Sequence, residues 1–292
     1  MARRYRARQM ITALGFLSPF AVFFVLFLIV PIVQVVIQTF QTGGLSRRMS
    51  FAGLANWENV FNDPVVYRSL ENSVRYAVIV IPLVLVLGFI VAMLLQRIGR
   101  GAATFRAMLY FPNLAPVVIA GLIWLFLVDP DFGAFNLTLR AVGLPPQTWL
   151  GNSDLALPMV AALEIWRAVG FWALFFLATL ISLPRELYEA AHLDGAGGWQ
   201  RLRHITLPLM RRAILFAVVL ATIYNLQIFD SVFVMTDGGP AGTTQTVVWY
   251  IFKSLFSFDR VGFGATLSFV LLFIILVLTL VQMAILRQRR RA

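Results

Sequence analysis

The side chains that could carry catalytic or ligand chemistry are few in this 292-residue sequence. The only lysine, Lys253, follows Phe252, whereas a phosphate-binding P-loop requires a glycine directly before its lysine. The two histidines, His192 and His204, give only a weak metal signal, because the chain has no cysteine to complete a site. Neither a Gly-x-Ser-x-Gly nor a His-Glu-x-x-His pattern occurs. The sequence therefore predicts no catalytic residue, no metal site and no cofactor held by this chain, and it does not indicate an enzyme.

Polar residues that interrupt an apolar run form a second candidate set: Tyr224, Asn225, Gln227 and Asp230. Polar groups within a membrane span are costly, and they are candidates for a functional site. At about 1.5 Å per residue from Ala213, Asn225 lies near mid-membrane and Asp230 near the outer edge. Gln227 and Asp230 share a helix face, whereas Asn225 points elsewhere. We therefore expect that these residues do not all line one channel.

A charged pair lies in another apolar run. Glu164 and Arg167 are three positions apart, which places them on one face of a helix. They form either an ion pair that steadies the outer part of the span or part of a solute pathway, and we favour the ion pair.

The elements that must position these residues are membrane helices. The chain is 60% hydrophobic and only 13% charged, whereas soluble domains are about a quarter charged. The net charge of +11 does not indicate nucleic-acid binding, because the charges lie in short clusters between apolar runs. A helix needs about 20 apolar residues to cross the bilayer. The stretches that qualify are Ile11–Ile37, Val74–Leu95, Met108–Val128, Leu157–Leu180, Ala213–Met235 and Phe263–Leu286.

The distribution of cations orients these spans. With the N-terminus in the cytoplasm, 16 of the 24 lysine and arginine residues fall in cytoplasmic segments, as the positive-inside rule requires. Arg47 and Arg48 fall outside and weaken the rule locally. The basic N-terminus leads into a long apolar run, which indicates a retained first span rather than a cleaved signal peptide.

The predicted fold is all-α, a polytopic membrane protein with six transmembrane helices and both termini cytoplasmic. The predicted segments are a cytoplasmic tail (1–10), the first transmembrane helix (11–40), an extracytoplasmic loop (41–73), a core (74–286) with a cytoplasmic hairpin (184–210), and a basic cytoplasmic tail (287–292). In the outer parts, Phe51–Pro64 predicts a short interfacial helix and Asp237–Thr244 predicts a turn.

The cytoplasmic hairpin is the most polar long stretch of the chain. Pro184 suits the first turn of a helix, and Gly195 readily takes the left-handed conformation that ends one. A second helical piece follows and is expected to stop at Pro208. The turn between the two pieces consists of alanine and glycine, so another backbone can approach it closely. The alternative is an amphipathic hairpin that its arginines hold at the lipid surface.

The hairpin resembles the EAA motif of the permease subunits of bacterial ABC importers. The matching residues are Glu189, Ala190, Ala191, Asp194, Gly195, Ala196, Leu202, Ile205, Leu207 and Pro208. Leu202 is the one departure, because the family more often has phenylalanine there. Many fixed positions at fixed spacing make this a specific signal. Leu17–Phe40 and Phe229–Phe256 are similar to the first-permease type of maltose-like and glycerol-phosphate-like importers, so the resemblance covers nearly the whole chain.

The resemblance implies a type I importer in the bacterial plasma (inner) membrane. This chain would work with a second related permease, an ABC ATPase dimer that binds ATP and Mg, and an extracytoplasmic binding protein that delivers a sugar or sugar-like solute. The short helix of the motif would dock in a cleft of the ATPase. The resemblance also implies that Asn225 contacts the solute, with Tyr224 suited to stack on a sugar face. The solute stays open between disaccharide, oligosaccharide, polyol and glycerol phosphate.

Two other classes stay open. A stand-alone ion-coupled secondary transporter of a polar solute would need buried acidic residues or broken helices at mid-membrane. Asp230 lies too far toward the outer edge, and no second central carboxylate is evident. The third class is a membrane scaffold or enzyme without a transport role. Co-purification with an ATPase separates the importer from both.

Overall fold

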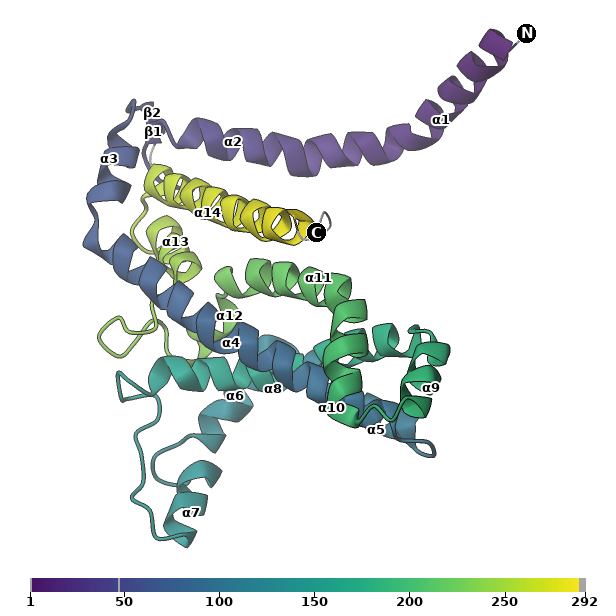
Figure 1. The fold of residues 1–292 in the computed structure, drawn as a ribbon. Coiled ribbons are helices and arrows are strands. Elements are labelled where there is room, and N and C mark those ends of the chain that lie inside the picture. The colour runs from purple at the N-terminus through teal and green to yellow at the C-terminus, as the bar shows by residue number, and fades with distance from the viewer. Residues whose placement is uncertain (1, 47, 289–292) are drawn as a thin grey trace. The chain divides into compact units, whose positions relative to one another are not determined.

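The computed structural model describes residues 2–46 and 48–288 (Figure 1). Within these residues the regular secondary structure is helical apart from one short antiparallel β-pair, which confirms the predicted all-α class. The elements in chain order are α1 (Ala2–Phe24), the π-helical turn η1 (Val25–Ile29), α2 (Val30–Gln38), β1 (Gln41–Thr42), β2 (Ser50–Phe51), α3 (Ala55–Asn62), α4 (Pro64–Gln96), α5 (Ala102–Leu114), α6 (Val117–Leu127), α7 (Ala134–Ala141), α8 (Ala156–Ile181), α9 (Arg185–Leu193), α10 (Gly198–Arg201), the π-helical turn η2 (Leu202–Thr206), α11 (Leu207–Leu226), α12 (Asp230–Met235), α13 (Val247–Phe256) and α14 (Val261–Gln288). Arg47, which belongs to the predicted charge pattern, and most of the predicted tail 287–292 lie outside the described residues.

Most of the predicted spans coincide with long apolar helices. Among the described residues, the helical runs that are long and apolar enough to cross a membrane are Leu14–Gln38, Pro64–Gln96, Ala156–Ile181, Gly198–Leu226 and Val261–Ile285. A sixth span exists if α5 and α6 count as one, although they are bent by 94°. The predicted span Met108–Val128 is therefore wrong as a single straight helix. Pro116 has no N–H to donate, and Ala115 before it is extended with ψ of 133°, as a residue before proline prefers.

The fifth predicted span, Ala213–Met235, is wrong at both ends. Its helical run begins earlier, at Gly198, and ends at Leu226. After a break at 227–229 the chain starts α12. The hydroxyl of Thr246, far along the chain, donates to the carbonyl oxygen of Ile228 (3.0 Å). The backbone freed by the break is thus satisfied by a distant side chain, which no local sequence pattern reveals.

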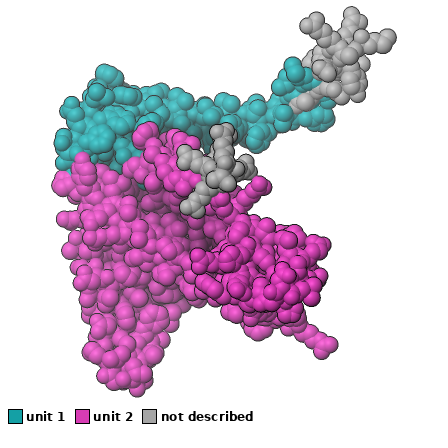
Figure 2. Space-filling view, in the orientation of Figure 1, with its two compact units in different colours: residues 1–63, 251–271 teal, residues 64–250, 272–292 magenta. Residues whose placement is uncertain are grey.

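One compact unit combines the described residues up to Asp63 with residues 251–271 (Figure 2). Buried Asn56 of α3 donates through its amide to the carbonyl oxygens of Thr39 (3.0 Å) and Gln41 (2.8 Å). Trp57 packs edge-on against Phe269 of α14, with ring centroids 5.8 Å apart. The helix predicted within residues 51–64 is present as α3, and its place at a membrane interface stays a prediction.

The second unit spans residues 64–250 and the described part of 272–292. In it, α4 and α5 pack on α8, and α11 packs on α4. The second span also starts earlier than predicted, since α4 begins at Pro64 rather than Val74. A Cβ atom on Gly170 of α8 would collide with the carbonyl oxygen of Leu109 in α5. Glycine at this position therefore lets the two backbones meet, as small residues do in membrane helix pairs.

The loop between α12 and α13 is tied to α4. The buried amide of Asn72 donates to the carbonyl oxygens of Gly242 (2.9 Å) and Gln245 (3.0 Å). Asp237 and Gly242 have positive φ of 43° and 80°, so the loop folds tightly. The turn predicted at Asp237–Thr244 is confirmed.

Candidate functional site

The hairpin predicted at 184–210 begins with α9, which ends as expected. Pro184 lies at the N-cap, directly before the first helical residue. Gly195 has φ of 76°, which is the left-handed conformation predicted for it. The N–H of Ala196 donates to the carbonyl oxygen of Ala191 (2.8 Å). This bond satisfies one of the last carbonyl groups of α9 and closes the helix.

Two side chains that sequence reasoning missed close the hairpin. The hydroxyl groups of Tyr188 in α9 and Thr206 in η2 lie 3.0 Å apart and share a hydrogen bond. Thr206 is buried, although most of the hairpin is exposed. The N–H of Gly197 donates to Oε1 of Gln200 (2.7 Å), which caps the start of α10. Tyr188 and Thr206 are 18 positions apart, so no helical spacing marks them as partners.

The second helical piece does not stop at Pro208, and that prediction was wrong. The elements α10, η2 and α11 form one helical run of 29 residues, Gly198–Leu226. The π-helical turn η2 precedes Pro208, which lies in the first turn of α11. Proline in a helix removes a hydrogen bond and crowds the carbonyl group four residues earlier. A wider π turn at that place accommodates the ring, and η1 precedes Pro31 in the same way.

The hairpin presents backbone and small side chains at its turn. A Cβ atom on Gly195 would meet no described atom within 4 Å. Two large apolar side chains flank the turn, since Leu193 is 88% exposed and Trp199 is 70% exposed. Such side chains need a partner surface or lipid to cover them. Of the motif residues, Glu189, Ala190, Asp194, Gly195, Leu207 and Pro208 are exposed, and Ala191, Ala196, Leu202 and Ile205 are half-buried.

A polar cavity of about 350 Å³ lies at the other end of the same helical run. It is lined by residues of α5, α6, α8, α11 and α12. All four predicted pathway residues, Tyr224, Asn225, Gln227 and Asp230, line it. The expectation that they could not share one channel was wrong, because it assumed an unbroken helix. Since α11 ends at Leu226, the residues after it no longer follow helical spacing.

The predicted pair of Glu164 and Arg167 is present and also lines the cavity. Nη1 of Arg167 lies 2.9 Å from Oε2 of Glu164. Nε of Arg167 and the hydroxyl of Ser231, another lining residue, are buried without a hydrogen-bond partner among the described residues. Buried polar atoms are normally paired. Two groups that build the cavity wall therefore have unused hydrogen-bonding capacity among the described residues, although neither atom is exposed to the cavity.

Two of the breaks between consecutive helices meet at this cavity. Asn113 and Val117, on either side of the bend between α5 and α6, line it together with Gln227, Ile228 and Phe229 from the second break. Irregular backbone at membrane depth is tolerated where it lines a polar cavity. Asn225 is buried and its amide donates to the carbonyl oxygen of Ala221 (2.8 Å), so its orientation is fixed by its own helix.

The comparisons with known proteins agree with this architecture. The sequence model of the family described as "Binding-protein-dependent transport system inner membrane component" matches residues 84–291. This range contains both the hairpin and the cavity-lining residues.

Individual relatives cover nearly the whole chain. "Probable ABC transporter permease protein YurN" of Bacillus subtilis (strain 168) is 34% identical over 273 residues, which are 92% of this chain and 93% of that protein. "Lactose transport system permease protein LacF" of Rhizobium radiobacter is 31% identical, over 94% of each chain. A solved bacterial ABC transporter involved in the import of the acidic polysaccharide alginate superposes with a TM-score of 0.86 and 19% identity, over 99% of each chain. At that identity the superposition supports the fold alone.

Proposed function

Because the chain belongs to the family of binding-protein-dependent transport system inner membrane components, we propose that it is the permease subunit of an ATP-driven ABC importer of a neutral sugar or sugar-like solute. Family membership makes the chain a multi-pass transport subunit of the inner membrane, not an enzyme. The observation that carries the proposal is the continuous helix Gly198–Leu226, which joins the exposed hairpin to the polar cavity.

This helical run connects the hairpin mechanically to the cavity. At about 1.5 Å per residue, its 29 residues follow a path of about 44 Å, which turns between α10 and α11 (Figure 1). The hydrogen bond between Tyr188 and Thr206 ties α9 to its first part, and Tyr224 and Asn225 lie near its other end. A displacement of the hairpin therefore reaches the cavity through one unbroken helical run.

The hairpin is the surface that engages the ATPase. Its exposed, nearly side-chain-free turn and the flanking apolar side chains of Leu193 and Trp199 support this role. ATP and Mg are bound by the ATPase dimer, and this chain contributes no cofactor ligand. The proposed coupling residues are Glu189, Ala190, Ala191, Asp194, Gly195, Ala196, Leu202, Ile205, Leu207 and Pro208.

The cavity favours a neutral, hydroxyl-rich solute. The carboxylates of Glu164 and Asp230 outnumber the guanidinium of Arg167 among the charged side chains that line it. An anionic solute would meet a net negative charge among these side chains, which is unfavourable. The amides of Asn225 and Gln227 and the ring of Tyr224 suit hydroxyl groups and the apolar face of a sugar. A lactose-like solute thus fits better than glycerol phosphate, and the relative named for lactose transport supports the sugar class.

The remaining components follow from the family. A second related permease completes the pathway, and an extracytoplasmic binding protein delivers the solute. The hairpin lies on the cytoplasmic side, with both termini, as the distribution of arginines indicates.

A stand-alone secondary transporter is the competing function. Broken helices and an acidic residue at the cavity, which such transporters use, are both present. Membership of the importer family outweighs these features, since they are equally compatible with a permease.

A single cysteine at Ala191 separates the two functions, because the natural sequence has no cysteine. In the native host, a short bifunctional crosslinker should join it to an ATPase subunit, with a yield that changes when nucleotide is added. A cysteine at Arg97, in another predicted cytoplasmic link, is the matched control and should give a lower, nucleotide-independent yield. If Ala191→Cys captures only lipid or a second copy of this chain, the coupling role is wrong.

A further inference from the structure

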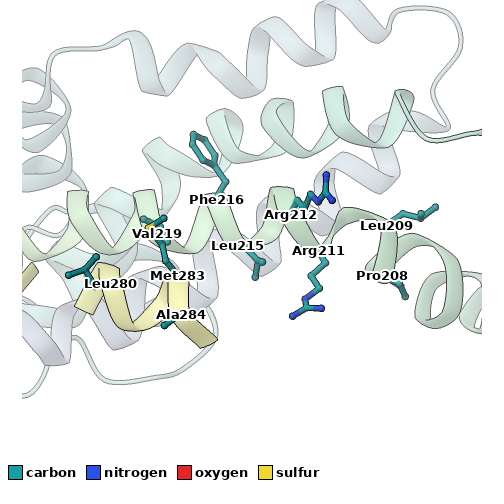
Figure 3. Close-up of a pocket in the computed structure, with 10 residues that line it drawn as sticks. All are labelled: Pro208, Leu209, Arg211, Arg212, Leu215, Phe216, Val219, Leu280, Met283 and Ala284. Carbon is teal, nitrogen blue, oxygen red and sulfur yellow. The ribbon is translucent and has the colours of Figure 1, made fainter. Parts of the chain in front are cut away.

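An apolar groove of about 1020 Å³ lies between α11 and the C-terminal part of α14, within the second unit (Figure 3). Leu215 and Val219 of α11 and Leu280 and Met283 of α14 contribute to its walls. A hydrogen bond from Nε2 of Gln282 to the hydroxyl of Thr222 (2.9 Å) links the two helices beside the groove.

The charged side chains that line the groove are two neighbouring arginines, Arg211 and Arg212. They precede the apolar part of α11, so the groove has a cationic end and an apolar remainder. Figure 3 shows Arg211 and Leu215 pointing to the side of α11 where α14 ends, whereas Arg212 and Phe216 point to the opposite side. Arg211 is half-buried and Arg212 is exposed.

We propose that this groove binds an anionic phospholipid, with the headgroup phosphate at Arg211 and an acyl chain along Leu215 and Val219. Arginine is well suited to phosphate because its guanidinium forms bidentate hydrogen bonds. Basic pockets between membrane helices bind anionic headgroups for this reason. Arg212 adds attraction from the other side of the helix without holding the phosphate.

The dimensions of the groove match one lipid leaflet. Along α11, Arg211 and Val219 are eight residues apart in sequence, which corresponds to about 12 Å. One leaflet supplies about half of the roughly 30 Å hydrocarbon core. A guanidinium at the membrane boundary and an apolar wall of this depth therefore accept a headgroup and its acyl chain together.

Native mass spectrometry of the complete detergent-solubilised importer tests the proposal, with phosphatidylglycerol and phosphatidylcholine of equal chain length as probes. We expect selective retention of phosphatidylglycerol. An arginine near the surface contributes about 1 kcal/mol toward anionic lipid, so Arg211→Gln should weaken retention about fivefold. Arg212→Gln, which removes the same charge on the other side of α11, should weaken it less than about twofold.

A second variant tests the apolar part without changing charge. Ala284 lines the groove, and Ala284→Phe should fill it and reduce phosphatidylglycerol retention while the importer still assembles. Equal retention of both lipids, or equal losses in Arg211→Gln and Arg212→Gln, would overturn the proposal. So would a crosslink from Leu215→Cys to the second permease in the assembled importer, because the groove would then be a subunit interface.

Discussion

The hairpin and the cavity lie at opposite ends of one helical run, yet they are built differently. The hairpin is exposed, and side chains within the hairpin itself, such as Tyr188 and Thr206, hold it together. The cavity draws its walls from five helices and holds an ion pair that is mostly shielded from solvent. The surface that engages a partner thus has small side chains at its turn. The site that selects a solute is instead built from helices that are distant in the sequence.

The largest effect should come from the packing that supports the cavity. Gly170→Ala places a Cβ atom against the carbonyl oxygen of Leu109, and backbone cannot rotate away as a side chain can. We expect a loss of about 3 kcal/mol or more in the free energy of unfolding. Thermal unfolding of the purified importer measures it. Gly99→Ala is the control, because a Cβ atom there meets no described atom within 4 Å; equal unfolding midpoints for both variants would show that the cavity wall is not rigid.

The next effect concerns the ion pair. Glu164→Gln leaves the guanidinium of Arg167 without its partner, which should cost about 3 kcal/mol. Glu71→Gln removes a carboxylate 2.6 Å from Arg75 in an exposed pair, and it should cost less than about 1 kcal/mol. Thermal unfolding of the two variants under the same conditions compares them. Similar losses would mean that the cavity pair is as well hydrated as the surface pair.

A substitution in the hairpin should change the coupling of solute uptake to ATP hydrolysis rather than the stability of the importer. Gly195→Asp adds bulk and charge at the turn, and we expect solute uptake per ATP hydrolysed to fall about tenfold as docking weakens. Uptake and ATPase rates of the reconstituted importer measure this ratio. Gly101→Asp is the matched control, because Gly101 also has positive φ (82°) and a Cβ atom there would meet no described atom within 4 Å. Normal coupling in Gly195→Asp would remove the docking role.

A smaller effect is expected at the cavity wall. Asn225→Ala removes one amide that can hydrogen-bond to a sugar hydroxyl, so uptake should fall about fivefold. Basal ATP hydrolysis should stay unchanged, because the hairpin is untouched. Ile223→Ala, at a residue of the same helix that does not line the cavity, is the control. Unchanged uptake in Asn225→Ala would indicate that this residue does not contact the solute.

The smallest effect tests how firmly α9 is attached. Tyr188→Phe removes its hydrogen bond to Thr206, a loss of about 1 kcal/mol. Hydrogen exchange of the amides in α9 should accelerate about fivefold without a change in the global unfolding midpoint. Thr206→Val also removes the bond from the Thr206 hydroxyl to the carbonyl oxygen of Arg201 (3.4 Å). In α9 it should give a similar acceleration, and the double variant should add little there, since both variants remove the same link to α9. Additive effects would show that the two hydroxyl groups act separately.

Local features of both regions could be predicted from the sequence. The left-handed conformation of Gly195 and the pairing of Glu164 with Arg167 depend on residues within one or two turns, so composition and spacing were sufficient. The membrane spans were found for the same reason, because a run of apolar residues is itself a local signal.

The cavity could not be predicted, because its form depends on contacts between distant segments. The break after Leu226 contains no proline or glycine, and the hydroxyl of Thr246 satisfies the freed carbonyl group of Ile228. Helical spacing therefore placed Asn225 and Asp230 on different faces in the prediction, although in the folded chain both line one cavity. The bend at Pro116 did have a local signal in the sequence, because a proline within an apolar run indicates that the helix ends before it.

The π-helical turn η2 sets the direction in which the side chains of α11 point, about the helix axis, relative to the hairpin. A π turn holds one residue more than an α turn, so it is equivalent to a single inserted amino acid. Each residue of an α-helix advances the chain by about 100° around its axis. If the same five residues, Leu202–Thr206, were wound as an α turn, every later side chain would rotate by about that angle relative to the hairpin. Asn225 would then face a different neighbour although the sequence of the span was unchanged, so it is the local winding of the helix, not its composition, that keeps the two ends in register.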